Sequence, residues 1–484
     1  MNLSLFDWSI VAALLVALLT IAAYARRYTR GVTDFLSANR CAGRYLLTLS
    51  EGLTALGLVG VIANFEKFYK AGFAASWWGL MMAPIGMVIA LSGWVNYRYR
   101  ETRALTMAEF FERRYSRRFR VFAGILGWAS GVLNYGIFPG VTARFLVYFC
   151  GLPPAFSIAG LEIPTIAPVM LAMLSVTLFL TLSGGMVTVM ITDFLQAQFI
   201  NIVFLAVGGV LLAQFAWGDI ANTLSATPPG KSLIDPFDQA GIADFNVWFF
   251  LIFAFKLFYN RLGWQGTQGF NCAAKSPHEA KMAGILAEWR GGITYLILTL
   301  IPICAYVLLH NEQFAAQAAG INAALGAVPD EHLRSQVTVP LALVRMLPVG
   351  AVGLLCAALV AGTIGNDTTY LHAWGSIFVQ DVYLPLKKKT DLPPAEHLRL
   401  LRLSILGVAA FAFVFSLVFP LRDYILMYQL ITGAIYLGGS GAAIIGGLYW
   451  RRGTTKGAWW GMGVGSAVAT AGALLTALWP GLPA

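Results

Sequence analysis

The chain has 484 residues, of which 58% are hydrophobic and only 12% are Asp, Glu, Lys or Arg. Soluble globular domains carry about 25% charged residues, so this composition excludes an ordinary soluble protein and predicts a polytopic membrane protein. The formal net charge of +10 would suit nucleic-acid binding only if the basic residues gathered on one surface.

Long apolar stretches, separated by short polar segments, follow one another along the whole chain. Because about 20 residues of α-helix cross the hydrocarbon layer, each is long enough to be a membrane span. Basic residues follow the first stretch and do not precede it, so we expect a permanent anchor and no cleaved signal peptide. We predict twelve spans, near residues 7–25, 46–66, 77–97, 121–148, 165–182, 187–213, 246–263, 284–308, 349–375, 403–421, 424–449 and 457–479.

The basic residues are distributed unequally between alternate loops. Of the 33 Lys and Arg, 23 fall in one set of loops and six in the other, while Arg144, Lys256, Arg261 and Arg290 lie within or at the ends of spans. Short loops rich in Lys and Arg remain on the cytoplasmic side. We therefore expect a plasma-membrane protein, in a bacterial inner membrane, with both termini outside. Its surrounding partner is the lipid bilayer, and no nucleic-acid partner is expected.

The second apolar stretch is interrupted by Gly52, Gly57 and Gly60 before it reaches Glu66 and Lys67. Closely spaced glycines weaken a helix, and membrane helices interrupted in mid-span expose carbonyl groups that can bind cations. Glycine also allows helices to pack closely. A binding site and a packing role are both open at this point.

The segment 349–383 carries a polar cluster in the middle of a long apolar run. Such a cluster is costly in a membrane unless it faces a partner, a cavity or an ion, so it indicates a functional site. Two adjacent threonine hydroxyls, with a glycine carbonyl one turn earlier, suit a small alkali cation. The alternative is that each threonine bonds the carbonyl four residues back and no ion is bound. The cluster comprises Asn366, Asp367, Thr368, Thr369 and His372.

Six sets of segments, in chain order, resemble those of one known family. They are DFLSANR and FYKAGFA on either side of the interrupted span, ALTMAEFFERRYSRRFR, SGGMVTVMITDFLQAQ, CAAKSPHEAKMAG, VPLALVRMLPVGAVGLLCAALVAG with FVQDVY, and WRRGTTKGAWWGMGVG. On these motifs the chain is similar to the sodium:solute symporter family. The resemblance covers nearly the whole chain.

The resemblance implies an all-α fold of the LeuT type, in which two inverted five-helix repeats are flanked by one helix at each end. The first and sixth core helices of such folds are interrupted in mid-membrane, where solute and sodium meet. Five predicted spans per repeat, an odd number, agree with opposite orientations of the halves. The expected parts are a first helix and inside loop (1–45), the first repeat (46–213), an outer loop (214–245), the second repeat (246–449) with an outer cap (309–348), and a last helix (450–484).

The resemblance also implies a Na+ site between the first and eighth core helices. We place its ligands by counting from Tyr69 and Asp381 in the matched motifs. The ligands are two backbone carbonyls of the first core helix and a small residue with a Thr pair on the eighth: Leu53, Leu56, Gly365, Thr368 and Thr369.

Some family members carry a second sodium site, built from the Asp of the TD motif and two later serines. Asp193 is present, but Leu371 and His372 replace the serines, so we expect one Na+. Asp193 and His372 could instead form a hydrogen-bonded or proton-sharing pair. The alternatives are a helix-start carboxylate for Asp193 and a core histidine bonded to a carbonyl for His372.

Asp367 is a further candidate for ion coupling. It stands where the family has an apolar residue, and an unpaired carboxylate in hydrocarbon would be costly. Three states are open for it: a neutral carboxyl, a carboxylate open to the cavity, or a carboxylate paired with Lys256, Arg261 or Arg144.

Solute contacts are expected from the interrupted helices and the third core helix. Sugar-carrying members place polar side chains on the first core helix, and their absence here disfavours a sugar. Lys256 and Arg261 favour the carboxylate of a small organic acid or amino acid, because a guanidinium binds carboxylate through two parallel hydrogen bonds. The expected contacts are Ala55, Gly57, Val59, Gly60, Asn134, Tyr135, Tyr259, Asn260, Arg261, Trp264 and Gln265.

The sequence therefore predicts sodium-coupled symport of a small polar organic solute. It holds no constellation of nucleophile, base or metal ligands near a surface, so an enzyme is not expected. Two alternatives stay open: a sensor or binding protein that kept the fold without transport, and a symporter driven by protons.

Overall fold

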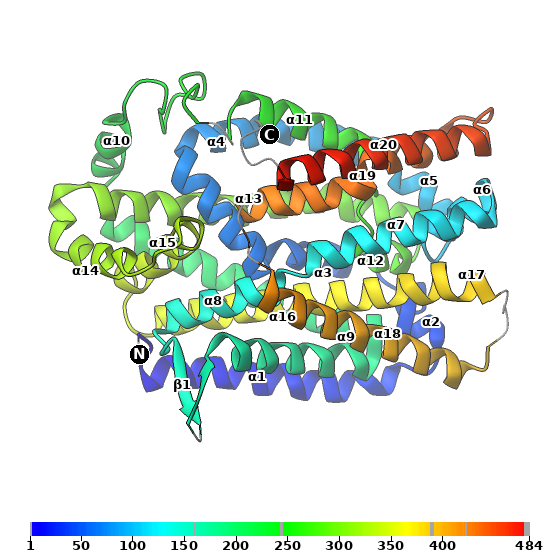
Figure 1. Cartoon of the computed structure of the whole chain (residues 1–484), viewed down its shortest axis with the longest axis horizontal. Helices are drawn as coiled ribbons and strands as arrows, with labels where there is room; N and C mark the ends of the chain where they lie inside the picture. Colours follow the sequence, from blue (N-terminus) through cyan, green and yellow to red (C-terminus); the bar gives the residue numbers. More distant parts are fainter. Residues whose placement is uncertain are drawn as a thin grey trace.

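The computed structural model describes residues 2–158, 160–242, 245–387, 392–419, 421 and 424–478. Most of these residues form long helices that run roughly along the longest axis of the molecule (Figure 1). Within the described residues, nine helices are long and apolar enough to cross a membrane, and Val247–Tyr259 is a shorter apolar helix. The chain is thus a multi-pass membrane protein, and the count of twelve spans stays a prediction.

The elements are labelled as in Figure 1. In chain order they are α1 (Leu5–Ala25), η1 (Arg26–Tyr28), α2 (Val32–Ser37), η2 (Ala38–Arg40), α3 (Arg44–Leu53), η3 (Thr54–Leu56), α4 (Leu58–Ser92), α5 (Asn96–Glu101), α6 (Met107–Arg114), α7 (Arg117–Tyr135), α8 (Phe138–Cys150), β1 (Ala155–Ile158), β2 (Leu161–Pro164), α9 (Ile166–Gln214), α10 (Trp217–Ser225), α11 (Val247–Tyr259), η4 (Gln265–Thr267), α12 (Gln268–Ala273), α13 (Pro277–His310), η5 (Glu312–Phe314), α14 (Ala315–Gly326), α15 (Glu331–Met346), α16 (Ala351–Ile377), the π-helix η6 (Phe378–Tyr383), α17 (Leu384–Lys387), α18 (Pro394–Val418), α19 (Ile425–Tyr449) and α20 (Thr455–Leu478). Strands β1 and β2 form an antiparallel hairpin.

Two of the longest helices turn sharply at a glycine. Helix α4 turns at Gly72 (φ 55°, ψ −146°) and α9 turns at Gly185 (φ 53°, ψ −138°). Side chains are strained at these angles, and a Cβ on Gly72 would also lie 2.5 Å from the carbonyl oxygen of Leu233. Each long helix therefore consists of two segments, and the turn in α9 falls between the predicted spans 165–182 and 187–213.

The predicted interruptions of the first and sixth core helices are both present. Helix α3 ends at Leu53, and after the short η3 an extended Gly57 (ψ 147°) precedes the start of α4. In the second half, α11 ends at Tyr259, Leu262 has a positive φ of 57°, and the helix resumes only through η4 and α12. Chain direction and hydrogen bonding are thus broken at two places in the bundle, which leaves backbone polar groups for other partners.

Helix α16 lies at the centre of the bundle. The most apolar window of this span is 89% buried, the highest share among the nine candidate membrane helices. It packs against α9, α1 and α18, and also against the interruption η3. Its polar cluster is therefore enclosed by protein.

The loops predicted to share one side of the membrane do lie together. Figure 1 shows α2, α5, α6 and α17 at one end of the long axis, whereas α14, α15 and the start of α1 lie at the other. Which end faces the cytoplasm stays a prediction from the charges.

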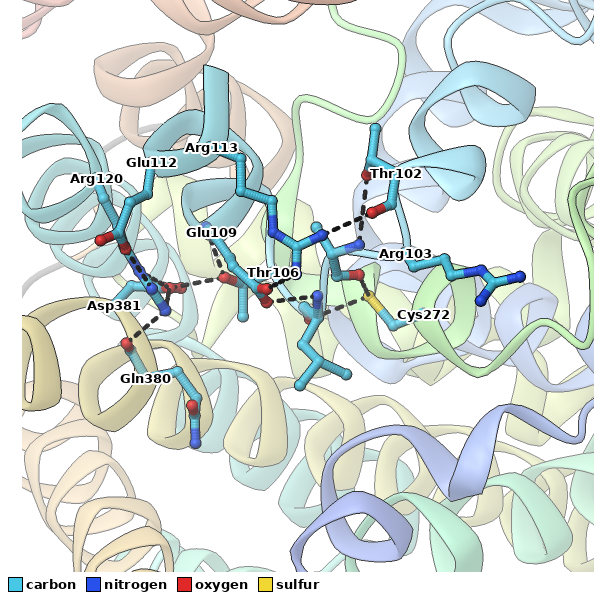
Figure 2. A network of polar contacts seen from close by, with 12 residues as sticks. Thr102, Arg103, Thr106, Glu109, Glu112, Arg113, Arg120, Cys272, Gln380 and Asp381 are labelled. Atoms are coloured by element: carbon cyan, nitrogen blue, oxygen red, sulfur yellow. Dashed lines mark hydrogen bonds and ion pairs between the residues drawn. The ribbon is translucent and has the colours of Figure 1, made fainter. Parts of the chain in front are cut away.

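A buried polar network joins α6, α7 and η6 at the end that holds α17 (Figure 2). The Thr106 hydroxyl donates to Oδ1 of Asp381 at 2.6 Å, and Nε of Arg120 donates to the same oxygen at 3.1 Å. The other guanidinium nitrogens of Arg120 bond Oε2 of Glu112 at 2.6 Å and the carbonyl of Gln380 at 2.8 Å. The network fixes the π-helix to the first half of the chain.

Candidate functional site

Helix α16 holds the start of α4 directly beside the first interruption. The amide nitrogen of Leu58 donates to Oγ1 of Thr363 at 3.1 Å, and this hydroxyl donates in turn to the carbonyl of Leu359 at 2.9 Å. The first amide of a helix has no partner within the helix, so a side chain of α16 supplies it here. The interruption is thereby held in contact with the polar cluster.

The two residues with predicted carbonyl ligands, Leu53 and Leu56, both touch α16. A Cβ on Gly362 would clash with the carbonyl oxygen of Leu56, and a Cβ on Gly365 would clash with the side chain of Leu53. Glycine at these two positions allows the backbone of the interruption to approach α16 closely. The structure thus brings together the segments that we expected to share a cation.

The two threonine hydroxyls of the cluster have different partners. Oγ1 of Thr368 donates to the carbonyl of Gly365 at 2.9 Å, a bond within the helix. Oγ1 of Thr369 donates to Oδ2 of Asp193 on α9 at 3.4 Å. Each hydroxyl has one hydrogen and two lone pairs, so a donated bond leaves lone pairs for a cation.

Gln196 is a polar residue of this region that the sequence analysis missed. Its Oε1 and the Oδ1 of Asp193 would lie 2.8 and 2.9 Å from a Cβ on Gly365. Neither oxygen has a hydrogen-bond partner among the described residues, and both side chains are buried. The spacing could have identified it, since residues three apart share a helix face and Gln196 follows Asp193 by three.

Two interpretations of Asp193 and His372 are corrected. Asp193 is fully buried inside α9, two turns beyond Gly185, so it is not a helix-start carboxylate. Nε2 of His372 lies 2.7 Å from the carbonyl oxygen of Phe35, and the two rings are in contact at 5.4 Å. Because Asp193 faces Thr369 and His372 faces Phe35, the described contacts contain no bond between the Asp and the His.

A pairing of Asp367 with a cation, one of the three states left open for it, is not formed in the described part of the chain. Asp367 is only 2% exposed and its Oδ1 has no partner among the residues described. Lys256 instead lies 5.5 Å from the ring of Phe253, and Nε of Arg261 donates to Asn96 at 3.2 Å. Helix position explains the difference, because these cations line a cavity that Asp367 does not reach.

The environment of Asp367 is aromatic. The ring of Tyr135 on α7 stacks on that of Tyr370 on α16 at 6.0 Å, one turn from Asp367. The Tyr135 hydroxyl is also buried without a described partner. Arg144, the third candidate cation, belongs to α8.

A cavity of about 380 Å³ lies beside the second interruption. Its wall is formed by α3, α5, α7, α11 with the irregular residues that follow, η4, α16 and α19. Four of the eleven predicted solute contacts line it: Asn134, Asn260, Arg261 and Trp264. Trp264 is fixed there by a hydrogen bond from Nε1 to the hydroxyl of Tyr370 at 3.1 Å.

The other seven predicted contacts do not line this cavity. The hydroxyl of Tyr259 bonds the backbone of α19 at Gly438 and Ala442. The amide of Gln265 donates to the carbonyls of Leu262 and Gly263 and so stabilises the irregular turn. The remaining five are Ala55, which is exposed, and Gly57, Val59, Gly60 and Tyr135, which pack inside the bundle or against α16.

The cavity contains one acidic residue that the sequence analysis did not single out. Glu51, in the last turn of α3, lines the cavity together with Lys256 and Arg261. Arg290 on α13 lies directly behind it, because a Cβ on Gly52 would clash with the Arg290 guanidinium. Nε and Nη1 of Arg290 are buried without a described partner. A charged residue inside an apolar span is a signal that could have identified Glu51, as it did Arg290.

Comparisons with known proteins agree with this architecture. A model of the sodium:solute symporter family matches residues 35–465. The chain is 23% identical to the sodium/glucose cotransporter of Vibrio parahaemolyticus over 491 residues, covering 94% of this chain and 83% of that protein. It is 24% identical to the sodium/pantothenate symporter of Haemophilus influenzae, covering 80% and 74%, and 23% identical to the sodium/proline symporter of Staphylococcus aureus, covering 97% and 84%.

A solved structure shares the fold. It is a substrate-bound, outward-open Na+-coupled sialic acid symporter, with a TM-score of 0.75 and 16% identity over 98% of both chains. The matched residues 35–465 include both interruptions, the polar cluster and the cavity. The chain therefore belongs to the sodium:solute symporter family.

Proposed function

We propose that this chain carries a small solute with a carboxylate group, and that an amino acid fits its cavity best. Membership of the family makes the chain a sodium-coupled symporter of a small organic solute and not an enzyme. The proposal of a carboxylate solute, and of an amino acid in particular, rests on the charged residues that line the cavity. Two cations, Lys256 and Arg261, and one carboxylate, Glu51, line the same cavity.

Arg261 is suited to bind the solute carboxylate. Its Nε is engaged by Asn96 at 3.2 Å, and no described contact engages its two terminal nitrogens. A guanidinium can then take a carboxylate through parallel hydrogen bonds. Lys256 contributes a second positive charge to the same wall.

Glu51 and Asn260 provide acceptors for an amino group of the solute. Oδ1 of Asn260 is buried without a partner among the described residues, and Glu51 presents the carboxylate of the wall. An ammonium group has three donors and requires such oxygens. A solute with both a carboxylate and an ammonium group can therefore pair with more of the polar groups that line the cavity than a simple acid or a sugar can.

We further propose that one Na+ binds at Leu53, Leu56, Gly365, Thr368 and Thr369. The support is that the interruption packs against α16, with the carbonyl oxygen of Leu56 at Gly362 and the side chain of Leu53 at Gly365. Glu51 and Leu53 belong to the same last turn of α3. An ion that orders this turn also orders Glu51 in the cavity, which is a direct route for coupling between ion and solute.

Sodium entry supplies the energy for uptake. Each ~100 mV of inside-negative potential contributes about 2.3 kcal/mol for one charge moved across the membrane. We propose the outside location of both termini from the charge asymmetry, supported by the gathering of α2, α5, α6 and α17 at one end (Figure 1). The test is to add one cysteine at either terminus of the chain and to label it from outside in intact cells.

The solute is tested by uptake into proteoliposomes under an inside-negative potential, with sodium or choline outside. The panel contains neutral amino acids, monocarboxylates and glucose. We expect sodium-dependent uptake of an amino acid and competition by other amino acids. Uptake of glucose without any competing acid or amino acid would contradict the carboxylate proposal.

A further inference from the structure

A second cavity, of about 700 Å³, lies between α7, η6 and α18. Its lining is almost entirely apolar and includes Trp128 and Val132 of α7, Phe378 of η6, and Leu403 and Phe411 of α18. Leu403 is 54% exposed and Phe411 is 39% exposed, so the cavity is a groove open at the surface of the bundle. All three walls belong to candidate membrane spans, so the groove faces hydrocarbon.

A glycine of α18 faces the groove. Gly407 lines the groove, and a Cβ at this position would meet nothing within 4 Å. A larger residue at this position would therefore have room to extend into the groove. Apolar space of this kind at a membrane-facing surface is filled by an apolar molecule.

Each of the three walls of the groove, α7, η6 with the short α17 that follows it, and α18, has a basic residue at the same end. Arg118 is exposed and shares a helix face with Ile125, Ala129 and Val132 of α7, by the spacing of seven, eleven and fourteen residues. Nζ of Lys387 lies 4.9 Å from the ring of Tyr383, a groove residue.

The third wall, α18, also has a basic residue at this end, and we call Arg118, Lys387 and Arg399 the rim of the groove. Arg399 of α18 is exposed and directly precedes the groove residue Leu400. Glu396, one turn earlier, is exposed and leaves the rim with an excess of positive charge. Basic pockets between membrane helices recognise anionic lipid headgroups.

The depth of the groove matches one leaflet. Arg118 and Trp128 are ten residues apart on α7, about 15 Å along the helix. Half of a bilayer core of ~30 Å has the same length. A headgroup at the rim would place its hydrocarbon chain along the groove.

We propose that the groove binds one anionic phospholipid, with an acyl chain between α7, η6 and α18 and its phosphate between Arg118, Lys387 and Arg399. The phospholipid lies against η6, whose residue Asp381 belongs to the buried network of Figure 2. The π-helix is thereby packed between a lipid on one side and Arg120 on the other.

The test is native mass spectrometry of the purified full chain after reconstitution in vesicles of phosphatidylglycerol and phosphatidylcholine in equal amounts. We expect the chain to retain phosphatidylglycerol in preference to phosphatidylcholine. Gly407→Trp fills the groove and should reduce retention several-fold. The triple variant Arg118→Gln, Lys387→Gln, Arg399→Gln should remove the preference for phosphatidylglycerol.

Two control variants make the same kinds of substitution at positions that do not line the groove. Gly463→Trp on α20 also adds a side chain into open space, and Arg452→Gln removes an exposed arginine from the turn between α19 and α20, which does not line the groove. Both should retain lipid like the unmodified chain. Equal retention of the two lipids, or retention unchanged by Gly407→Trp, would overturn the proposal. Retention is read without transport, so the result is independent of the proposed solute.

Discussion

The hydroxyl of Thr369 on α16 lies 3.4 Å from Oδ2 of Asp193 on α9, at a point where both side chains are buried. Two turns earlier on α16, the carbonyl oxygen of Leu56 lies against Gly362. The Leu56 carbonyl and the Thr369–Asp193 contact thus lie at two levels of α16, seven residues or about 10 Å apart along the helix. The Na+ site that we propose takes its hydroxyl ligands from the level of Thr368 and Thr369.

Removing the hydroxyls should weaken sodium activation. We expect Thr368→Ala and Thr369→Ala each to raise the half-saturating sodium concentration about tenfold, because an oxygen contact to a charge contributes about 1.5–3 kcal/mol. Thr369→Ser keeps the hydroxyl and should stay near the unmodified value. The measurement is initial uptake against external sodium at constant ionic strength. Unchanged sodium activation in both alanine variants would remove the assigned site.

Gly362 provides a test that leaves every proposed ligand in place. The Cβ of Gly362→Ala would clash with the Leu56 carbonyl oxygen, so α16 or the interruption must shift. We expect a higher half-saturating sodium concentration, read in the same uptake assay. Gly292→Ala is the matched control, since a Cβ there meets nothing within 4 Å. A normal sodium response of Gly362→Ala would show that the Leu56 carbonyl is not a ligand.

The interruptions could be predicted because glycine acts locally and because the family motifs place them. Gly57 has an extended backbone and the helix stops there, as the closely spaced glycines indicated. The motif spacing likewise brought Leu53, Leu56 and Gly365 into one region. The interruption and the spacing of these residues both follow from which residue occupies which position in the chain, and this is read directly from the sequence.

Side-chain direction could not be predicted in the same way. Counting along a motif placed Tyr259 and Gln265 at the sixth core helix, but their polar groups bond the backbone and do not line the cavity. A cation partner was one possibility for Asp367, yet none is found for it among the described residues, and Glu51 was overlooked. Which face meets a cavity depends on how the helices are rotated against one another, and no local pattern fixes that rotation.

Arg261 should distinguish charge from geometry in solute binding. Arg261→Gln removes the guanidinium and should raise the KM for a carboxylate solute about tenfold or more, because a charge-assisted pair is lost. Arg261→Lys restores the charge without the planar pair of donors, so it should recover only part of the affinity. The measurement is uptake against solute concentration at saturating sodium.

A control for this prediction is Lys231→Gln, which removes a positive charge in the loop between α10 and α11, away from the residues that line the cavity. Its KM should be unchanged. If Arg261→Gln lowered the maximal rate at constant KM, the arginine would act in the conformational cycle and not in solute binding.

Arg120 should be needed for the stability of the end of the bundle that Figure 2 shows. Its guanidinium nitrogen Nη2 lies 3.0 Å from Oδ1 of Asp381, whose side chain is 0% exposed. Arg120→Met leaves that carboxylate buried without its cation, and such a loss costs about 3–5 kcal/mol. The midpoint of thermal unfolding in detergent, at constant sodium, should fall clearly.

Arg98→Met is the control: its partner Glu101 is 3.8 Å away and both side chains are largely exposed, so the loss should stay within about 1 kcal/mol. Equal midpoints for the two variants would mean that Asp381 is satisfied by Thr106 alone, and that the π-helix does not depend on Arg120 for its position.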